Sequence, residues 1–73
     1  MAYYEARINR IFVTHERRNC WAHLQGVGWR KVDPRNTDGV TNMHAALVTA
    51  RSMGVTIPIR TDDDDQMILR IYV

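Results

Sequence analysis

Cysteine is nearly absent from this sequence, since Cys20 is the only one among 73 residues. No intrachain disulfide can form, and a lone thiol fits a reducing compartment without requiring one. A chain of this length buries only about 60% of the surface that its unfolded form exposes, so it needs a disulfide, a metal or self-association for stability. Because metal ligands are also sparse, we expect a homo-oligomer.

Long apolar runs are absent as well. None approaches the roughly 18 residues of a membrane-spanning helix, so we expect no membrane insertion. Residues 1–10 are polar and charged and do not resemble a signal peptide. This predicts either a cytoplasmic protein or a secreted chain whose leader has been removed. Repeats and linkers are missing too, and one domain over residues 1–73 is expected.

Catalytic and metal-binding motifs are missing. The sequence has no Gly-x-Ser-x-Gly, no His-Glu-x-x-His and no phosphate-binding glycine loop. Cys20 and His23 are three residues apart on a predicted strand, so they point to opposite faces. The aspartates at 62–65 lack the spacing and the glycine of a calcium loop, and we expect them to form a solvated hairpin turn. We therefore predict no enzyme activity, no cofactor and no metal.

The sequence does contain short stretches of alternating apolar residues separated by turn residues, which predict five strands. They cover residues 3–14, 20–25, 29–32, 55–60 and 67–73. A helix over residues 42–53 lies between the third and fourth strands. The order β-β-β-α-β-β predicts a mainly β fold with one helix, an OB-like five-stranded barrel. An α+β sandwich, with the helix on one open sheet, is the alternative.

Alternation also assigns faces to the strand residues. In residues 20–25 it places Cys20, Ala22 and Leu24 inside, and in residues 67–73 it places Met67, Leu69, Ile71 and Val73 inside. The first strand breaks this pattern because two residues separate Ile8 from Ile11. A β-bulge near Asn9 and Arg10 would return both isoleucines to one face.

Large side chains on the outer face of a small barrel suggest a binding surface. Stacking on bases, stacking on sugar rings and packing against another subunit all use such rings. The predicted ligand-binding residues are Trp21, His23, Gln25, Arg30 and Tyr72, and Trp29 is equally compatible with the core and the surface. On the helix, Ala45, Val48 and Ser52 lie off the core stripe, and they are the predicted oligomer interface.

Three segments carry a resemblance to a known family. They are Ile8-x-x-Ile11-x-Val13, Leu47-x-x-Ala50-x-x-x-Gly54-Val55-x-Ile57 and Ile68-x-x-Ile71-Tyr72-Val73. This pattern resembles the B subunits of subtilase cytotoxin and related AB5 toxins. The resemblance implies an OB-fold pentamer with its helices near the central axis and sugar sites on the barrel exteriors. Those subunits carry a disulfide, whereas this chain has a single cysteine.

Three functions follow from these expectations. The first is a homo-oligomeric module that binds a glycan or another small polar ligand, and the resemblance implies that this module is a pentameric ring. The second is an OB-type protein that binds single-stranded nucleic acid; its arginines favour this, but the net charge of only +2 and the acidic turn do not. The third is an accessory factor that binds a protein partner.

Overall fold

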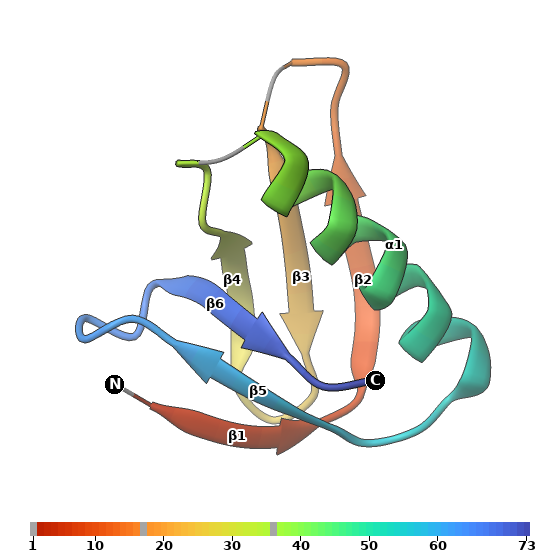
Figure 1. The fold of residues 1–73 in the computed structure, drawn as a ribbon. Helices are drawn as coiled ribbons and strands as arrows, with labels where there is room; N and C mark the ends of the chain where they lie inside the picture. Colours follow the sequence, from red (N-terminus) through yellow and green to blue (C-terminus); the bar gives the residue numbers. More distant parts are fainter. Residues whose placement is uncertain (1, 17, 36) are drawn as a thin grey trace.

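A computed structural model describes residues 2–16, 18–35 and 37–73, without the side chain of residue 37. It contains one sheet of mixed strand directions and one helix (Figure 1). In chain order the elements are β1 (Tyr3–Ala6), β2 (Ile8–Val13), β3 (Cys20–Leu24), β4 (Gly28–Val32), α1 (Thr37–Met53), β5 (Ile57–Thr61) and β6 (Met67–Ile71). The prediction of a mainly β fold with one helix is therefore confirmed.

The six strands follow the order β1-β5-β6-β4-β3-β2, and the sheet is not closed into a barrel. The predicted first strand is divided at Arg7, whose carbonyl oxygen accepts a hydrogen bond from the amide of Gln25 at 2.9 Å. Before this bend β1 pairs with β5, and after it β2 pairs with β3. The five-stranded barrel is thus not matched, because one long strand has become two strands at opposite ends of the strand order.

Two β-bulges bend the sheet. The pairing of β2 with β3 shifts between Ile8 and Arg10, which confirms the bulge predicted near Asn9. A second shift falls between β5 and β6, where Arg60 pairs with Arg70 but Thr61 pairs with Ile68. The extra residue, Leu69, reverses the expected alternation. An arrangement with Met67 and Leu69 inside would place Ile68 outside, but Ile68 is fully buried, so that prediction is wrong.

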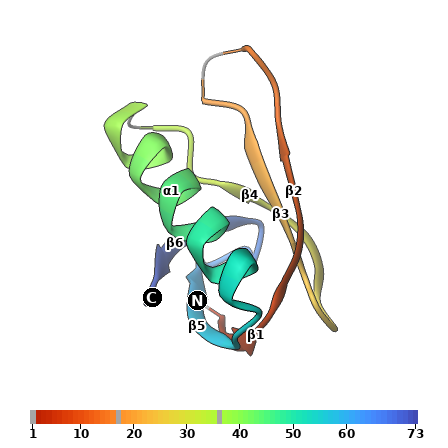
Figure 2. The ribbon, with the colours of Figure 1, turned by 90° about the vertical axis from the view of Figure 1, so that its right-hand side faces the viewer.

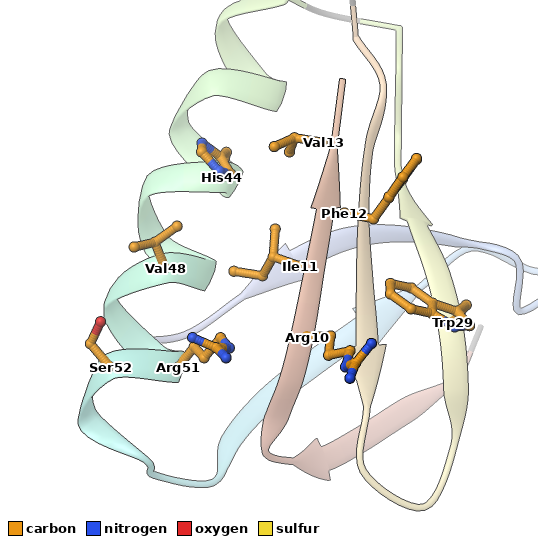
Figure 3. Close-up of a pocket in the computed structure, with 9 residues that line it drawn as sticks. All are labelled: Arg10, Ile11, Phe12, Val13, Trp29, His44, Val48, Arg51 and Ser52. Atoms are coloured by element: carbon orange, nitrogen blue, oxygen red, sulfur yellow. The ribbon is translucent and has the colours of Figure 1, made fainter. Parts of the chain in front are cut away.

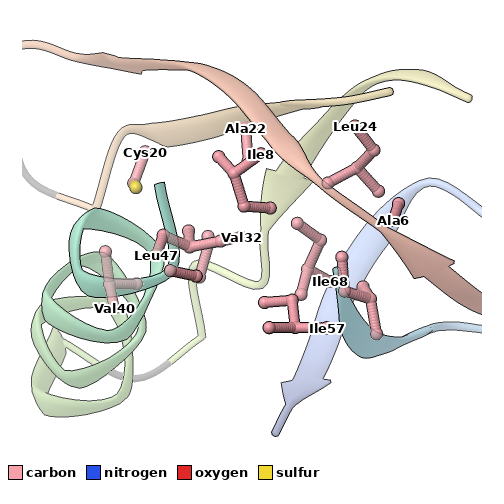
Figure 4. Packing of buried hydrophobic residues seen from close by; sticks show 12 residues of the cluster. Ala6, Ile8, Cys20, Ala22, Leu24, Val32, Val40, Leu47, Ile57 and Ile68 are labelled. Carbon is pink, nitrogen blue, oxygen red and sulfur yellow. The ribbon is translucent and has the colours of Figure 1, made fainter. Parts of the chain in front are cut away.

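The core lies between α1 and the inner face of the sheet (Figures 2 and 4). The predicted inward residues of β3, Cys20, Ala22 and Leu24, are buried there. Leu47 of α1 and Ile59 of β5 are also fully enclosed. Burying one aliphatic side chain of this size contributes roughly 1.5–3 kcal/mol, so these contacts hold the helix against the sheet.

The helix begins at Thr37, five residues before the predicted start at Asn42. Gly39 in its first turns lowers helix propensity, but the extra turn buries Val40 in the core, which favours the longer helix. The helix ends as predicted before Gly54, whose φ of 67° suits glycine at the C-terminal cap. Among the described residues, no helix has the length and apolar character needed to cross a membrane.

Candidate ligand-binding face

The outer sides of β2, β3 and β4 carry six side chains that we call the aromatic face: Arg10, Phe12, Trp21, His23, Trp29 and Lys31. Strand register arranges them in two rows. Phe12 pairs with Trp21, which pairs with Lys31, and Arg10 pairs with His23, which pairs with Trp29. Directly paired side chains lie about 5 Å apart and contact one another. The face is therefore continuous across all three strands, and its members Phe12 and Trp29 lie on the side of the sheet away from α1 (Figure 3).

Hydrogen bonding and charge fix the first row. The indole Nε1 of Trp21 donates to Oδ1 of Asn19 at 3.0 Å. The Nζ of Lys31 lies 5.7 Å from the centre of the Trp21 ring, within the range of a cation–π interaction. These contacts hold the indole in place while Phe12, 50% exposed, stays open to solvent.

Ring contacts fix the second row. The rings of His23 and Trp29 meet edge to face, with centres 5.2 Å apart and planes at 75°. The Nδ2 of Asn9, the bulged residue, lies 3.2 Å from Nδ1 of His23. Trp29 is 43% exposed, so the alternative left open by the sequence is resolved toward the surface.

The face is open and its charge is positive. Phe12, Trp21 and Trp29 line a shallow apolar depression of about 510 Å³. The three strands contain no aspartate or glutamate. Arg10 forms no hydrogen bond or ion pair with the described part of the chain, so its charge is available to a ligand. An anionic molecule with flat rings suits this arrangement.

Only two of the five predicted ligand-binding residues, Trp21 and His23, lie on the aromatic face. Gln25 follows β3 and is exposed, but it lies beyond the paired rows. Tyr72 follows β6, and its amide donates to the carbonyl oxygen of Pro58 at 3.1 Å, away from β2 and β3. Phe12 and Lys31 belong to the face although the sequence did not single them out. The bulge at Asn9 was the available signal for Phe12, because it sets which side of β2 that ring occupies.

Arg30 lies on the other side of β4 from Trp29 and Lys31, so its predicted outward position is wrong. Its Nη2 donates to Oδ2 of Asp65 at 3.1 Å. The hydroxyl of Thr61, which is fully buried, donates to Oδ1 of the same carboxylate at 2.8 Å. The hydroxyl of Tyr4 also donates to it. We call these four residues the polar cluster.

Asp65 therefore does not belong to a solvated hairpin tip, as the sequence suggested. The Arg30 guanidinium and the Tyr4 hydroxyl hold the pKa of its carboxyl well below the usual range. The hydrogen bond between Tyr4 and Asp65 raises the pKa of Tyr4. The hydrogen bond between Arg30 and Asp65 likewise raises the pKa of Arg30. Asp63 and Asp64 do remain exposed. The cluster ties the β5–β6 turn to β1 and β4, which is a structural task.

The predicted interface residues lie on the exposed side of α1. Ala45, Val48 and Ser52 are all exposed, and Val48 and Ser52 line a groove of about 650 Å³ between α1 and β2 (Figure 3). Ile11 and Val13 point into this groove from β2, while Phe12 and Trp29 lie on the far side of the strand. The groove and the aromatic face thus meet at the edge of β2.

Neither metal chemistry nor a reactive thiol is suggested by the described residues. No group of three or more His, Cys, Asp or Glu among them is placed to hold a metal ion. Cys20 is buried, and burial raises the pKa of its thiol, which disfavours the nucleophilic thiolate.

No relative identifies the chain. Comparison with protein-family models, with curated proteins and with solved structures gave no match.

Proposed function

We propose that this protein is a non-catalytic module that binds single-stranded nucleic acid on the aromatic face. The observation that carries the proposal is the placement of three rings, Phe12, Trp21 and Trp29, on the same side of three neighbouring strands. Bases stack on such rings whatever their identity, because each base has a π-face. Three rings offer stacking positions for about three bases.

The charges around the rings favour a nucleic acid over the glycan that ranks first from the sequence alone. Arg10 and Lys31 belong to the face, and the three strands hold no carboxylate that would repel phosphate. The acidic turn at 62–65, which counts against nucleic acid in the sequence, follows β5 and is separated from β3 by β6 and β4 in the strand order. A neutral sugar can accept hydrogen bonds from the two cations beside the rings, but unlike phosphate it has no negative charge for them to attract.

The strand order supports the same function. If β1 and β2 count as two halves of one bent strand, their pairings with β5 and β3 and the parallel pairing of β4 with β6 are those of an OB-fold. OB-folds bind oligonucleotides and oligosaccharides on the face of their second and third strands. In this chain those strands correspond to β3 and β4, which carry both tryptophans.

Tryptophan fluorescence tests the proposal, because the only two tryptophans both lie on the face. We expect quenching when the protein is titrated with homopolymeric DNA or RNA oligonucleotides at low salt. Single-tryptophan variants, Trp21→Phe and Trp29→Phe, should each retain part of the signal. Tyr72→Ala serves as the control, since this exposed ring lies off the face, and its affinity should equal that of the wild type.

The glycan alternative is decided in the same experiment. A set of neutral and sialylated oligosaccharides is titrated in parallel, under identical conditions. Quenching by oligosaccharides without quenching by oligonucleotides would overturn the proposal and favour the ligand of the toxin-like B subunits. Absence of any change with oligonucleotides, confirmed by the anisotropy of a labelled strand at low salt, would also reject it.

A further inference from the structure

β2 has a strand partner on one side only. It stands at the end of the strand order and pairs with β3. About half of the amide and carbonyl groups of a strand point to each side, so an edge strand offers unpaired groups to another chain. Arg51 covers one end of this edge, since its Nε donates to the carbonyl oxygen of Asn9 at 3.3 Å. In the described part of the chain, residues 10–14 have no second strand beside them.

Apolar side chains surround this open edge. Phe12, Val13 and Val48 are 50%, 46% and 42% exposed, which is unusual for three large hydrophobic side chains around one groove. The groove between β2 and α1 has room beside the strand (Figure 3). An edge with these properties, left uncovered, favours aggregation, so it needs a specific occupant.

We propose that this occupant is β2 of a second copy of the chain, paired antiparallel about a two-fold axis at Phe12. In this register Phe12 faces its own counterpart on the outer side. Ile11 of each copy lies opposite Val13 of the other on the inner side. An isologous contact must be self-complementary, and this register places apolar against apolar on both sides of the sheet.

Charge complementarity supports a second copy in this register. Arg10 lies opposite Thr14 of the second copy, just beyond the end of its β2. Glu16 of that copy follows in the next bend, where its carboxylate accepts a 3.4 Å hydrogen bond from the Thr14 hydroxyl. Arginine and glutamate side chains are both long enough to meet across neighbouring strands. Both residues are exposed, and Arg10 has no partner in the described part of its own chain. The two-fold axis produces this ion pair twice.

A contact of standard size would use a modest share of this chain's surface. A standard interface buries about 800 Å² per partner, which is about one-sixth of the 4704 Å² surface of this chain. The axis places both α1 helices on the same side of the joined sheet. Their exposed faces, with Ala45 and Val48, then approach each other across the axis. The predicted helix interface and the strand edge thus become one surface.

The dimer joins the two aromatic faces at Phe12. If the proposed nucleic-acid function is correct, one continuous strand crosses both faces and covers about twice as many nucleotides as a monomer would. The dimerisation itself does not depend on that function, and it is measured without nucleic acid.

Sedimentation equilibrium over a range of micromolar concentrations tests the association. We expect a monomer–dimer equilibrium that Val48→Arg weakens by about tenfold or more, because a charge placed in a buried apolar contact is costly. Met53→Arg is the matched control: it is 62% exposed on the same helix but does not line the groove, and its dimer should match the wild type. Circular dichroism confirms that both variants are folded.

Charge reversal tests the register. Arg10→Glu and Glu16→Arg should each weaken the dimer by about tenfold, since each puts like charges together. The double variant restores the pairing and should recover most of the affinity. A monomer at every concentration, a ring of another size, or a dimer unaffected by Val48→Arg and by the reversals would each overturn the proposal.

Discussion

The polar cluster and the aromatic face each bring rings and cations together, and they differ in whether the cations have partners. In the polar cluster, the carboxylate of Asp65 accepts hydrogen bonds from Arg30, Thr61 and Tyr4. On the aromatic face, Arg10 has no hydrogen-bond or ion-pair partner in the described part of the chain, and the ammonium of Lys31 lies over the Trp21 ring. The first region has satisfied its charges within the chain, whereas the second leaves the charge of Arg10 exposed.

Burial explains this difference. Thr61 is fully buried, and a buried polar group must be hydrogen-bonded or it lowers stability. Among the described residues, no buried side-chain nitrogen or oxygen lacks a partner. The aromatic face is exposed, so water can satisfy its polar groups. Substitutions in the polar cluster should therefore lower stability, whereas substitutions on the aromatic face should weaken the proposed binding.

The largest effect is expected when both tryptophans are removed. Each base that stacks on a ring contributes about 1–3 kcal/mol, so the Trp21→Ala/Trp29→Ala variant should bind a labelled oligonucleotide at least about 30-fold more weakly. The fold should remain, because both rings lie outside the core. Anisotropy measures the affinity and circular dichroism checks the fold. A variant that binds as tightly as the wild type would remove the distinction between the two regions.

The converse substitution is Asp65→Asn. It removes the charge that Arg30, Tyr4 and Thr61 share, and we expect a loss of about 1–3 kcal/mol in the free energy of unfolding. Asp64→Asn is the matched control, since its exposed side chain lies in the same turn. Urea denaturation should distinguish the two variants, while the oligonucleotide affinity of both stays at the wild-type level. Equal stability of the two variants would contradict a structural role for the cluster.

Lowering the pH should remove the contribution of the polar cluster to stability. The pKa of Asp65 is lowered in the folded state, so its contribution is complete above the unfolded value of about 3.9 and is lost progressively as the pH falls below it. The difference in unfolding free energy between wild type and Asp65→Asn should therefore shrink as the pH falls from about 4 to about 2. Urea denaturation at several pH values measures it. A constant difference would show that the carboxylate charge does not stabilise the fold.

The two bulges show how far the sequence determines the sheet. Ile8 and Ile11 are separated by two residues, and this spacing correctly predicts the bulge at Asn9. Ile68 and Ile71 have the same spacing, and the bulge at Leu69 likewise brings both toward the core. The second bulge is hidden in the sequence because nearly every residue from 67 to 73 is apolar. With apolar side chains on both faces, alternation alone does not assign an inside.

The candidate site was predictable where alternation was strict. The strand with Cys20, Ala22 and Leu24 inside places Trp21 and His23 outside, as predicted. Arg30 was misplaced because the third predicted strand is short and polar, so its face depends on pairing with β3 and on Asp65, 35 residues later. Such a partner leaves no local signal. The side of β2 on which Phe12 lies depends in turn on the bulge at Asn9.

The smallest expected effect concerns Lys31, and it tests whether the charge on the aromatic face contacts phosphate. For single strands, the logarithm of the affinity falls with the logarithm of salt concentration by about 0.7 per neutralised phosphate. Lys31→Gln should therefore reduce this slope by about 0.7 and weaken binding only modestly at moderate salt. Arg70→Gln, an exposed arginine on β6 away from the face, removes the same net charge and should leave the slope unchanged. Equal slopes for both variants would mean that Lys31 serves only to hold the Trp21 ring, and that the face differs from the polar cluster in exposure rather than in function.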